Sequence, residues 1–178
     1  NVKMVEFNHI NKTNYKIVKM KGVFFMSKQE REQKKRNVIE VLNKAKSMEL
    51  QAIHQYMYQH YNLDDKDYGE LAAKMKLIAI DEMRHAEAFA ERIKELGGDP
   101  TMVAAGSVTK GQDVEQIYDF DAEQEDDAID AYNTFLKVCL ENDDSTSAKL
   151  FEEIINHEQI HYNYFDNILE HIKDLGAA

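Results

Sequence analysis

The chain has 178 residues, 43% of them hydrophobic, which suits one domain built around one substantial core. Its net charge of −11, from 33 acidic and 22 basic residues, argues against a sequence-independent grip on nucleic acid. The same charge suits a protein that handles metal cations. One proline, seven glycines and 31% charged residues favour long helices, so we expect an all-α fold.

The cysteine content and the hydropathy of the chain indicate where in the cell the protein is expected. Cys139 is the one cysteine of the chain, so no intrachain disulfide can form and nothing requires an oxidising environment. No apolar run approaches the roughly 20 residues that a membrane helix needs. We therefore expect a soluble, cytoplasmic protein with no membrane partner.

The N-terminal segment, up to Phe25, differs in character from the rest. It carries five lysines against one glutamate and mixes β-branched residues with asparagines. It lacks the small-residue cleavage site of a secretory signal. We expect residues 1–25 to form an N-terminal extension of unknown role, followed from Met26 by a bundle domain over residues 26–178.

The residue pattern predicts three helices over about residues 29–62, 68–96 and 121–142. Asp143-Asp144-Ser145 then separates the third helix from a fourth, which is expected to reach about Leu175. Gly97-Gly98-Asp99-Pro100 terminates the second helix. The following stretch, to about residue 118, is too long for a tight turn and predicts a crossover. Asp121, with Gln124 three residues later, predicts the N-cap of the third helix. The expected architecture is two antiparallel hairpins joined by a long connection, with an up-down-up-down bundle as the alternative.

Each predicted helix has an apolar stripe, at alternating steps of three and four residues, that is interrupted by one glutamate. The four are Glu49, Glu82, Glu125 and Glu158. Any one of them alone would be expected to lean out to water. The sequence separation between Glu49 and Glu82 equals that between Glu125 and Glu158, and the midpoint of each pair falls at a predicted turn. Because both arms of a hairpin rise equally per residue, the members of each pair should lie at the same height.

An internal repeat extends this pattern. The step in sequence from Glu49 to Glu125, which we call the repeat offset, equals the step from Glu82 to Glu158. His85 and His161 are related by the same step, and each follows its glutamate by three residues, so each projects from the same helical face as that glutamate. An aromatic residue follows each of the four glutamates by seven positions. The pattern therefore indicates two copies of one hairpin related by a pseudo-two-fold axis.

Four carboxylates and two imidazoles inside an apolar bundle require compensation, because each bare buried ion costs several kcal/mol. No lysine or arginine occupies the seam positions. We therefore expect cations. Oxygen ligands with two imidazoles suit Fe(II) or Mn(II), with zinc as a competitor, and two metals that share bridging carboxylates compensate the most charge.

One motif permits a different interpretation. Residues 157–161, HEQIH, match the His-Glu-x-x-His pattern of zinc proteases, with His157 and His161 as ligands and Glu158 as base. The other hairpin has Asp81 where that motif needs its first histidine, so the element common to both halves is Glu-x-x-His. We therefore favour the dinuclear site. His157 is expected to lie outside the ligand set, as are His54, His60 and His171.

Residues 37–175 resemble bacterioferritin, a ferritin-like di-iron family. The likeness rests on the glutamate spacing of 33, 43 and 33, and on the segments MELQAIHQYM (48–57), IDEMRHAEAFAERI (80–93) and HEQIHYNYFDNI (157–168). The resemblance implies a ferritin-like four-helix bundle. It also implies metal roles: one iron held by Glu49 and His85, the other by Glu125 and His161, with Glu82 and Glu158 bridging.

The resemblance further implies iron storage and detoxification. Such proteins form a 24-subunit cage built from dimers, oxidise Fe(II) with oxygen or peroxide, store the ferric product, and take electrons from a donor such as a ferredoxin or rubredoxin. Met83 would ligate haem at a two-fold interface with its symmetry mate, although a helical methionine is by itself usually packing. Tyr56 resembles a tyrosine near the metals that is oxidised in turnover, with core packing as the alternative. The family commonly adds a short fifth helix, whereas this sequence ends at LGAA.

Two other functions stay open on the sequence. One is a smaller di-iron oxidase or peroxidase like rubrerythrin, without the cysteine-rich module usually fused to it. The other is a metal-free helical interaction protein with a protonated polar cluster. A starvation-type mini-ferritin is disfavoured, because its ligands come from two subunits.

Overall fold

The computed structural model describes residues 26–176, and these form four α-helices. They are α1 (Lys28–Asp65), α2 (Gly69–Glu95), α3 (Val114–Glu141) and α4 (Ser145–Gly176). The predicted all-α bundle is confirmed. Ser27 begins α1 through a capping box with Glu30, which satisfies backbone donors at the helix start. The expected extension over residues 1–25 lies outside the described residues.

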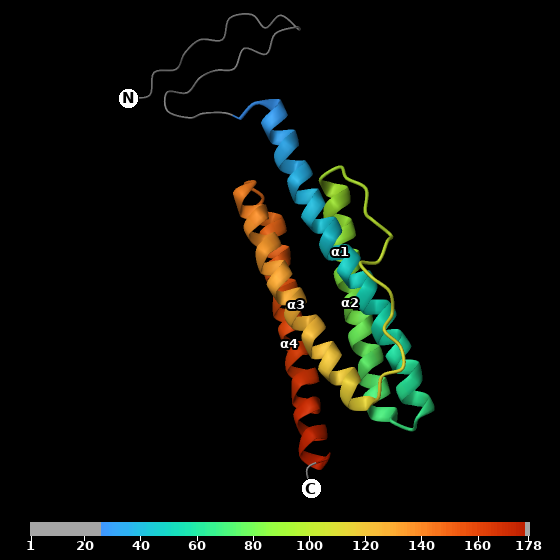
Figure 1. Ribbon diagram of the computed structural model, residues 1–178. Coiled ribbons are helices and arrows are strands. Elements are labelled where there is room, and N and C mark those ends of the chain that lie inside the picture. Colours follow the sequence, from blue (N-terminus) through green and yellow to red (C-terminus); the bar gives the residue numbers. More distant parts are fainter. Residues whose placement is uncertain (1–25, 177–178) are drawn as a thin grey trace, which may run out of the picture.

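The helices are arranged as two antiparallel hairpins. α1 packs along α2, and α3 packs along α4. The connection between α2 and α3 returns along the length of the bundle, so that α2 and α3 run in the same direction (Figure 1). This is the predicted crossover topology, and the up-down-up-down alternative is wrong.

The two hairpin turns have the same conformation. Asp67 and Asp143 both have positive φ angles, 63° and 59°. Aspartate tolerates this left-handed region better than most residues. In the first turn Tyr68 N donates to Leu63 O at 3.0 Å, and in the second turn Asp144 N donates to Cys139 O at 2.9 Å. The repeat offset that relates the glutamates also takes Asp67 to Asp143, so it relates the turns as well.

Helix α3 begins about two turns before the predicted position. Its N-cap is Asp113, which forms a capping box with Gln116. The predicted cap, Asp121, is wrong: it lies inside α3 and is fully buried. Both aspartates begin the same Asp-x-x-Gln pattern, but Ile117 and Tyr118 are buried in the core and extend the helix to the earlier cap.

The crossover, residues 96–113, begins near Gly97 with φ 82° and is bound along α1. A row of polar side chains on α1, spaced four residues apart, contacts it: Asn43, Ser47, Gln51, Gln55 and Gln59. Gln55 Nε2 donates to Thr109 O at 3.1 Å, and Thr109 N donates to Gln55 Oε1 at 2.8 Å. An amide side chain can satisfy both backbone groups of a loop residue, so this row anchors a segment without secondary structure.

The apolar core is divided into two clusters with a polar level between them. One cluster contains Leu42, Phe89 and Phe151, and the other contains Leu63 and Met75, among others. The seam glutamates lie between these clusters along the helices. None of the described helices combines the length and apolar character needed to cross a membrane.

Candidate metal centre

The six acidic and imidazole side chains of the predicted site converge at this polar level. Each has at most 4% of its surface exposed. α1 and α3 each contribute one glutamate, and α2 and α4 each contribute a glutamate and a histidine: Glu49, Glu125, Glu82 with His85, and Glu158 with His161. The structure thus brings together all six predicted residues in one subunit.

These residues form two overlapping groups. In each group, the candidate ligand atoms lie within 4.8 Å of one another. The first group is Glu49, Glu82, His85 and Glu158, and the second is Glu82, Glu125, Glu158 and His161. Glu82 and Glu158 belong to both, so the arrangement can hold two ions that share two carboxylates.

The distances follow the pseudo-two-fold symmetry. His85 Nδ1 lies 2.8 Å from Glu82 Oε2 and 3.1 Å from Glu158 Oε1. His161 Nδ1 lies 3.0 Å from Glu82 Oε1 and 3.2 Å from Glu158 Oε2. Each central carboxylate therefore turns one oxygen to each imidazole. The outer glutamates each face one imidazole, with Glu49 Oε2 3.9 Å from His85 Nδ1 and Glu125 Oε1 3.8 Å from His161 Nδ1.

Protons alone leave this cluster incompletely paired. Each imidazole Nδ1 faces two carboxylate oxygens but carries at most one hydrogen, which pairs with Glu82 Oε2 for His85 and with Glu158 Oε2 for His161. The other oxygens, Glu82 Oε1 and Glu158 Oε1, lie near an Nδ1 but are buried without a hydrogen bond. Buried carboxylate oxygens are almost always paired or bound to a cation. The donor set therefore fits two oxygen- and nitrogen-liganded metal ions.

Burial and mutual charge strongly perturb these groups. Burial, followed by the charges of neighbouring carboxylates, raises the pKa of Glu49 and of Glu125 well above the usual value. Burial would also raise the pKa of Glu82, but the imidazolium groups of His161 and His85 lower it to about 2. Burial would lower the pKa of both histidines, yet adjacent carboxylates raise it to about 11 for His85 and about 9 for His161. Without metal, the site is held together by protons that an ion must displace.

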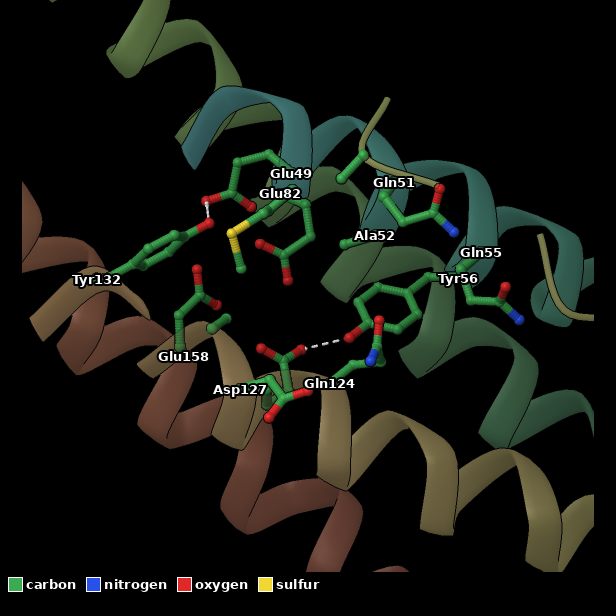
Figure 2. A pocket seen from close by; sticks show the side chains of 14 residues that line it. Glu49, Gln51, Ala52, Gln55, Tyr56, Glu82, Gln124, Asp127, Tyr132 and Glu158 are labelled. Atoms are coloured by element: carbon green, nitrogen blue, oxygen red, sulfur yellow. Dashed lines mark hydrogen bonds between the residues drawn. The ribbon is translucent and has the colours of Figure 1, made fainter. Parts of the chain in front are cut away.

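Two phenols cross between the hairpins to the outer glutamates. Tyr56 OH, from α1, donates to Glu125 Oε1 at 2.7 Å. Tyr132 OH, from α3, donates to Glu49 Oε1 at 2.6 Å (Figure 2). Both tyrosines are fully buried. The sequence prediction named Tyr56 and missed Tyr132, although the repeat offset relates the two.

The outer sides of the two imidazoles differ. His85 Nε2 lies 3.1 Å from His157 Nδ1, whereas the nearest acidic atom to His161 Nε2 is Asp81 Oδ2 at 3.8 Å. A zinc protease would need His157 and His161 to share an ion. His157 instead lies behind His85 and belongs to neither ligand group. That alternative is therefore disfavoured by the geometry.

A cavity of about 200 Å³ leads to this level between α1 and α3. Its inner wall contains the four glutamates and both tyrosines. Gln51 and the exposed Asp127 also line it (Figure 2). Ala105 of the crossover is a further lining residue. A small ion or molecule thus has space to approach the carboxylates.

Met83 follows the buried Glu82 and projects about 100° around α2 from it. It is 44% exposed, as its position one residue from the seam predicts. The Met83 side chain is therefore accessible to a group outside this subunit.

Comparisons with known proteins identify the family. The ferritin-like domain matches residues 39–175. The bacterioferritin of Desulfovibrio desulfuricans is 66% identical over 146 residues, which are 82% of this chain and 82% of that protein. The bacterioferritin of Streptomyces coelicolor is 37% identical over 141 residues, covering 79% of this chain and 84% of the relative.

Solved structures agree. An X-ray structure of the D. desulfuricans bacterioferritin, which describes its diiron site in different catalytic states, superposes with a TM-score of 0.81 at 66% identity. It covers 82% of this chain and 85% of that chain. A Mycobacterium tuberculosis bacterioferritin gives a TM-score of 0.74 at 35% identity, with 78% and 87% of the two chains covered. The chain therefore belongs to the ferritin-like family and, within it, to the bacterioferritins.

Proposed function

We propose that this protein is a ferroxidase and iron store that oxidises Fe(II) to Fe(III) at a di-iron centre inside each subunit. The observation that carries the proposal is the pair of ligand groups that share Glu82 and Glu158. The diiron site of the D. desulfuricans relative, 66% identical to this chain, supports it.

The ligand roles follow from which oxygen faces which imidazole. Glu49 and His85 would hold one ion and Glu125 and His161 the other, since each outer glutamate faces one imidazole. Glu82 and Glu158 would be shared by both ions, since each turns one oxygen to either side. Tyr56 and Tyr132 orient the outer carboxylates by donating hydrogen bonds to them.

The chemistry suits a pair of adjacent ions. Two Fe(II) ions give up one electron each. Oxygen takes these two electrons and two protons to form peroxide, and peroxide takes two electrons from a second pair of Fe(II) ions, with two more protons, to form two water molecules. Four carboxylates favour the higher charge of the ferric product over the ferrous substrate. The cavity between α1 and α3 provides an approach for iron and oxidant.

Storage requires an enclosure, and we propose a 24-subunit cage built from dimers, the assembly implied for bacterioferritins. The net charge of −11 favours the accumulation of cations. Retrieval of stored iron needs electrons from a small donor such as a ferredoxin or rubredoxin. We assign the protein to the cytoplasm, where the buried thiol of Cys139 stays free.

Met83 is the proposed haem ligand. Its exposed side chain would ligate the iron of a haem together with the Met83 of a second subunit. The haem would supply a redox group between subunits. Met83→Leu should remove porphyrin absorbance while leaving rapid iron oxidation intact. Loss of both would mean that Met83 acts through the fold instead.

A titration of the metal-free protein with Fe(II) in air tests the proposal. Rapid oxidation should saturate at two ions per chain, followed by slower growth of a mineral core inside a large assembly. Saturation far from two ions, with no retained iron, would contradict the ferroxidase assignment.

The second candidate is the smaller rubrerythrin-like oxidase or peroxidase, favoured by the same donor set. Gel filtration separates the two functions. A dimer with redox activity and no mineral core would support this alternative. A metal-free interaction protein would show no change of melting temperature on chelation, whereas bound ions stabilise the native state by mass action.

A further inference from the structure

The two halves of the metal centre are alike on their inner side and unlike on their outer side. Both imidazoles turn Nδ1 to the carboxylates at matching distances. Their Nε2 atoms face different residues, His157 behind His85 and Asp81 behind His161. The repeat offset takes Asp81 to His157, so these two residues occupy equivalent positions in the two hairpins.

The outer side determines how firmly an imidazole is held. A neutral imidazole that binds an ion through Nδ1 carries its proton on Nε2 and is oriented by the acceptor of that proton. His157 Nδ1 is such an acceptor for His85, at 3.1 Å. The two rings also stack, with centroids 5.3 Å apart and planes inclined by 25°.

His161 lacks an equally close acceptor among the described residues. Asp81 Oδ2 is 3.8 Å from His161 Nε2, which is beyond hydrogen-bond distance. Asp81 also forms an ion pair with Arg84 on the surface of α2, and 37% of its side chain is exposed. Its carboxylate is therefore drawn to another partner.

We propose that His157 is a positioning residue that orients His85 and makes the Glu49–His85 position the tighter of the two metal sites. The inference rests on the proposed ligand set. The two metal positions have the same kinds of ligand, but they fill in a fixed order. Residues outside the ligand set determine that order. Outer partners of metal-bound histidines typically contribute about 10- to 100-fold in affinity.

Cobalt(II) binding to the metal-free, assembled full chain tests this inference without turnover. The d–d absorbance and the heat of binding should resolve two steps per chain that differ by at least about tenfold in affinity. His157→Leu should weaken the tighter step by about tenfold, so that the two steps merge. His157→Asn should restore the separation, because its side-chain oxygen can occupy the place of Nδ1.

Two control variants separate positioning from general effects. His171→Leu removes another exposed histidine of α4 that contacts no ligand, and should leave both steps unchanged. Asp81→Asn should leave the tighter step unchanged. Circular dichroism should report an intact bundle in each variant, because both altered histidines are exposed.

The outcomes distinguish this inference from the proposed function. Two equal steps in the parent protein, or unequal steps that His157→Leu leaves unaltered, would overturn the positioning role while the di-iron centre stands. Failure of the parent chain to bind two cobalt ions would overturn the di-iron centre itself.

Discussion

The two hairpins are nearly interchangeable where they face each other and different where they face outward. The glutamates, the Nδ1 atoms of both histidines, the crossing phenols and the left-handed turns all recur at the repeat offset. These features either contact the shared site or set the height of the groups that do. A site with two bridging carboxylates constrains both halves equally, which accounts for the repeat.

The outward faces of α1 and α3 carry different chemistry at equivalent positions. Gln51 and Gln55 of α1 bind the crossover. Their counterparts on α3 at the same offset are the exposed Asp127 and the half-buried Ala131. Among the residues that the structure describes, the row of polar side chains that binds the long crossover lies on α1. The metal site therefore keeps the two hairpins alike, and the connection between them makes them differ.

The largest expected contrast is between substituting a bridging carboxylate and substituting an outer one, measured as the loss of metal affinity. Glu158→Gln removes charge from both positions and should lower the affinity for both ions by more than about 100-fold, since outer partners alone contribute up to that factor. Glu49→Gln should mainly lower the affinity for the ion beside Glu49 and His85. Metal analysis after equilibrium dialysis gives the ions bound per chain. The control Glu153→Gln alters an exposed residue of α4 and should retain two ions. Equal losses from Glu158→Gln and Glu49→Gln would contradict the sharing of Glu158.

The anchoring of the crossover on α1 is the next feature to break. Gln55→Leu leaves the N–H and carbonyl of Thr109 without partners, and should lower the free energy of unfolding by about 2–3 kcal/mol. Asp127→Asn, on the exposed face of α3, should change it by less than about 0.5 kcal/mol. Urea unfolding followed by circular dichroism measures both. Similar small changes in the two variants would mean that the amide row does not hold the crossover.

Acidification should weaken metal binding at both positions. Since the pKa values of His85 and His161 are raised to about 11 and about 9, both carry protons at neutral pH. The raised pKa values of Glu49 and Glu125 add protons as pH falls. Ions must displace these protons, so affinity rises with pH. We expect at least about tenfold weaker binding of each ion per unit of pH lost between about pH 7.5 and 5.5. Zinc titration calorimetry measures this slope, and a flat profile would contradict the raised pKa values.

Removing the two phenols should have the smallest effect on metal affinity, and the effect should be similar in the two hairpins. Tyr132→Phe and Tyr56→Phe each remove one donor from an outer glutamate, and each should weaken metal binding by up to about tenfold, the equivalent of a hydrogen bond of about 0.5–1.5 kcal/mol. Cobalt titration measures both. If affinity falls equally while only Tyr56→Phe slows iron oxidation, Tyr56 has a redox role that Tyr132 lacks. An affinity loss in one variant alone would contradict the claim that each phenol supports the outer glutamate of the opposite hairpin.

Periodicity and turn chemistry were sufficient to predict the bundle and the convergence of the six site residues. The seam of a helix follows directly from residue spacing, and antiparallel arms fix which residues share a height. Gly97 ended α2 as predicted because its φ of 82° suits glycine. The paired spacing of Glu49 with Glu82 and of Glu125 with Glu158 therefore carried the prediction.

Contacts between distant segments could not be predicted from local pattern. Asp121 and Asp113 begin the same capping pattern, and only the burial of Ile117 and Tyr118 decides between them. The anchoring role of Gln55 depends on where the crossover lies, which local pattern does not specify. The hydrogen bond of Tyr132 to Glu49 joins opposite hairpins. The repeat offset was the available signal for that contact.

Anomalous diffraction at the iron edge, from crystals of the protein loaded with Fe(II), would locate the ions themselves. We expect two peaks in each chain, both between Glu82 and Glu158, one beside Glu49 with His85 and the other beside Glu125 with His161. A single peak, or peaks held by residues of different subunits, would be incompatible with a di-iron centre built within one four-helix bundle.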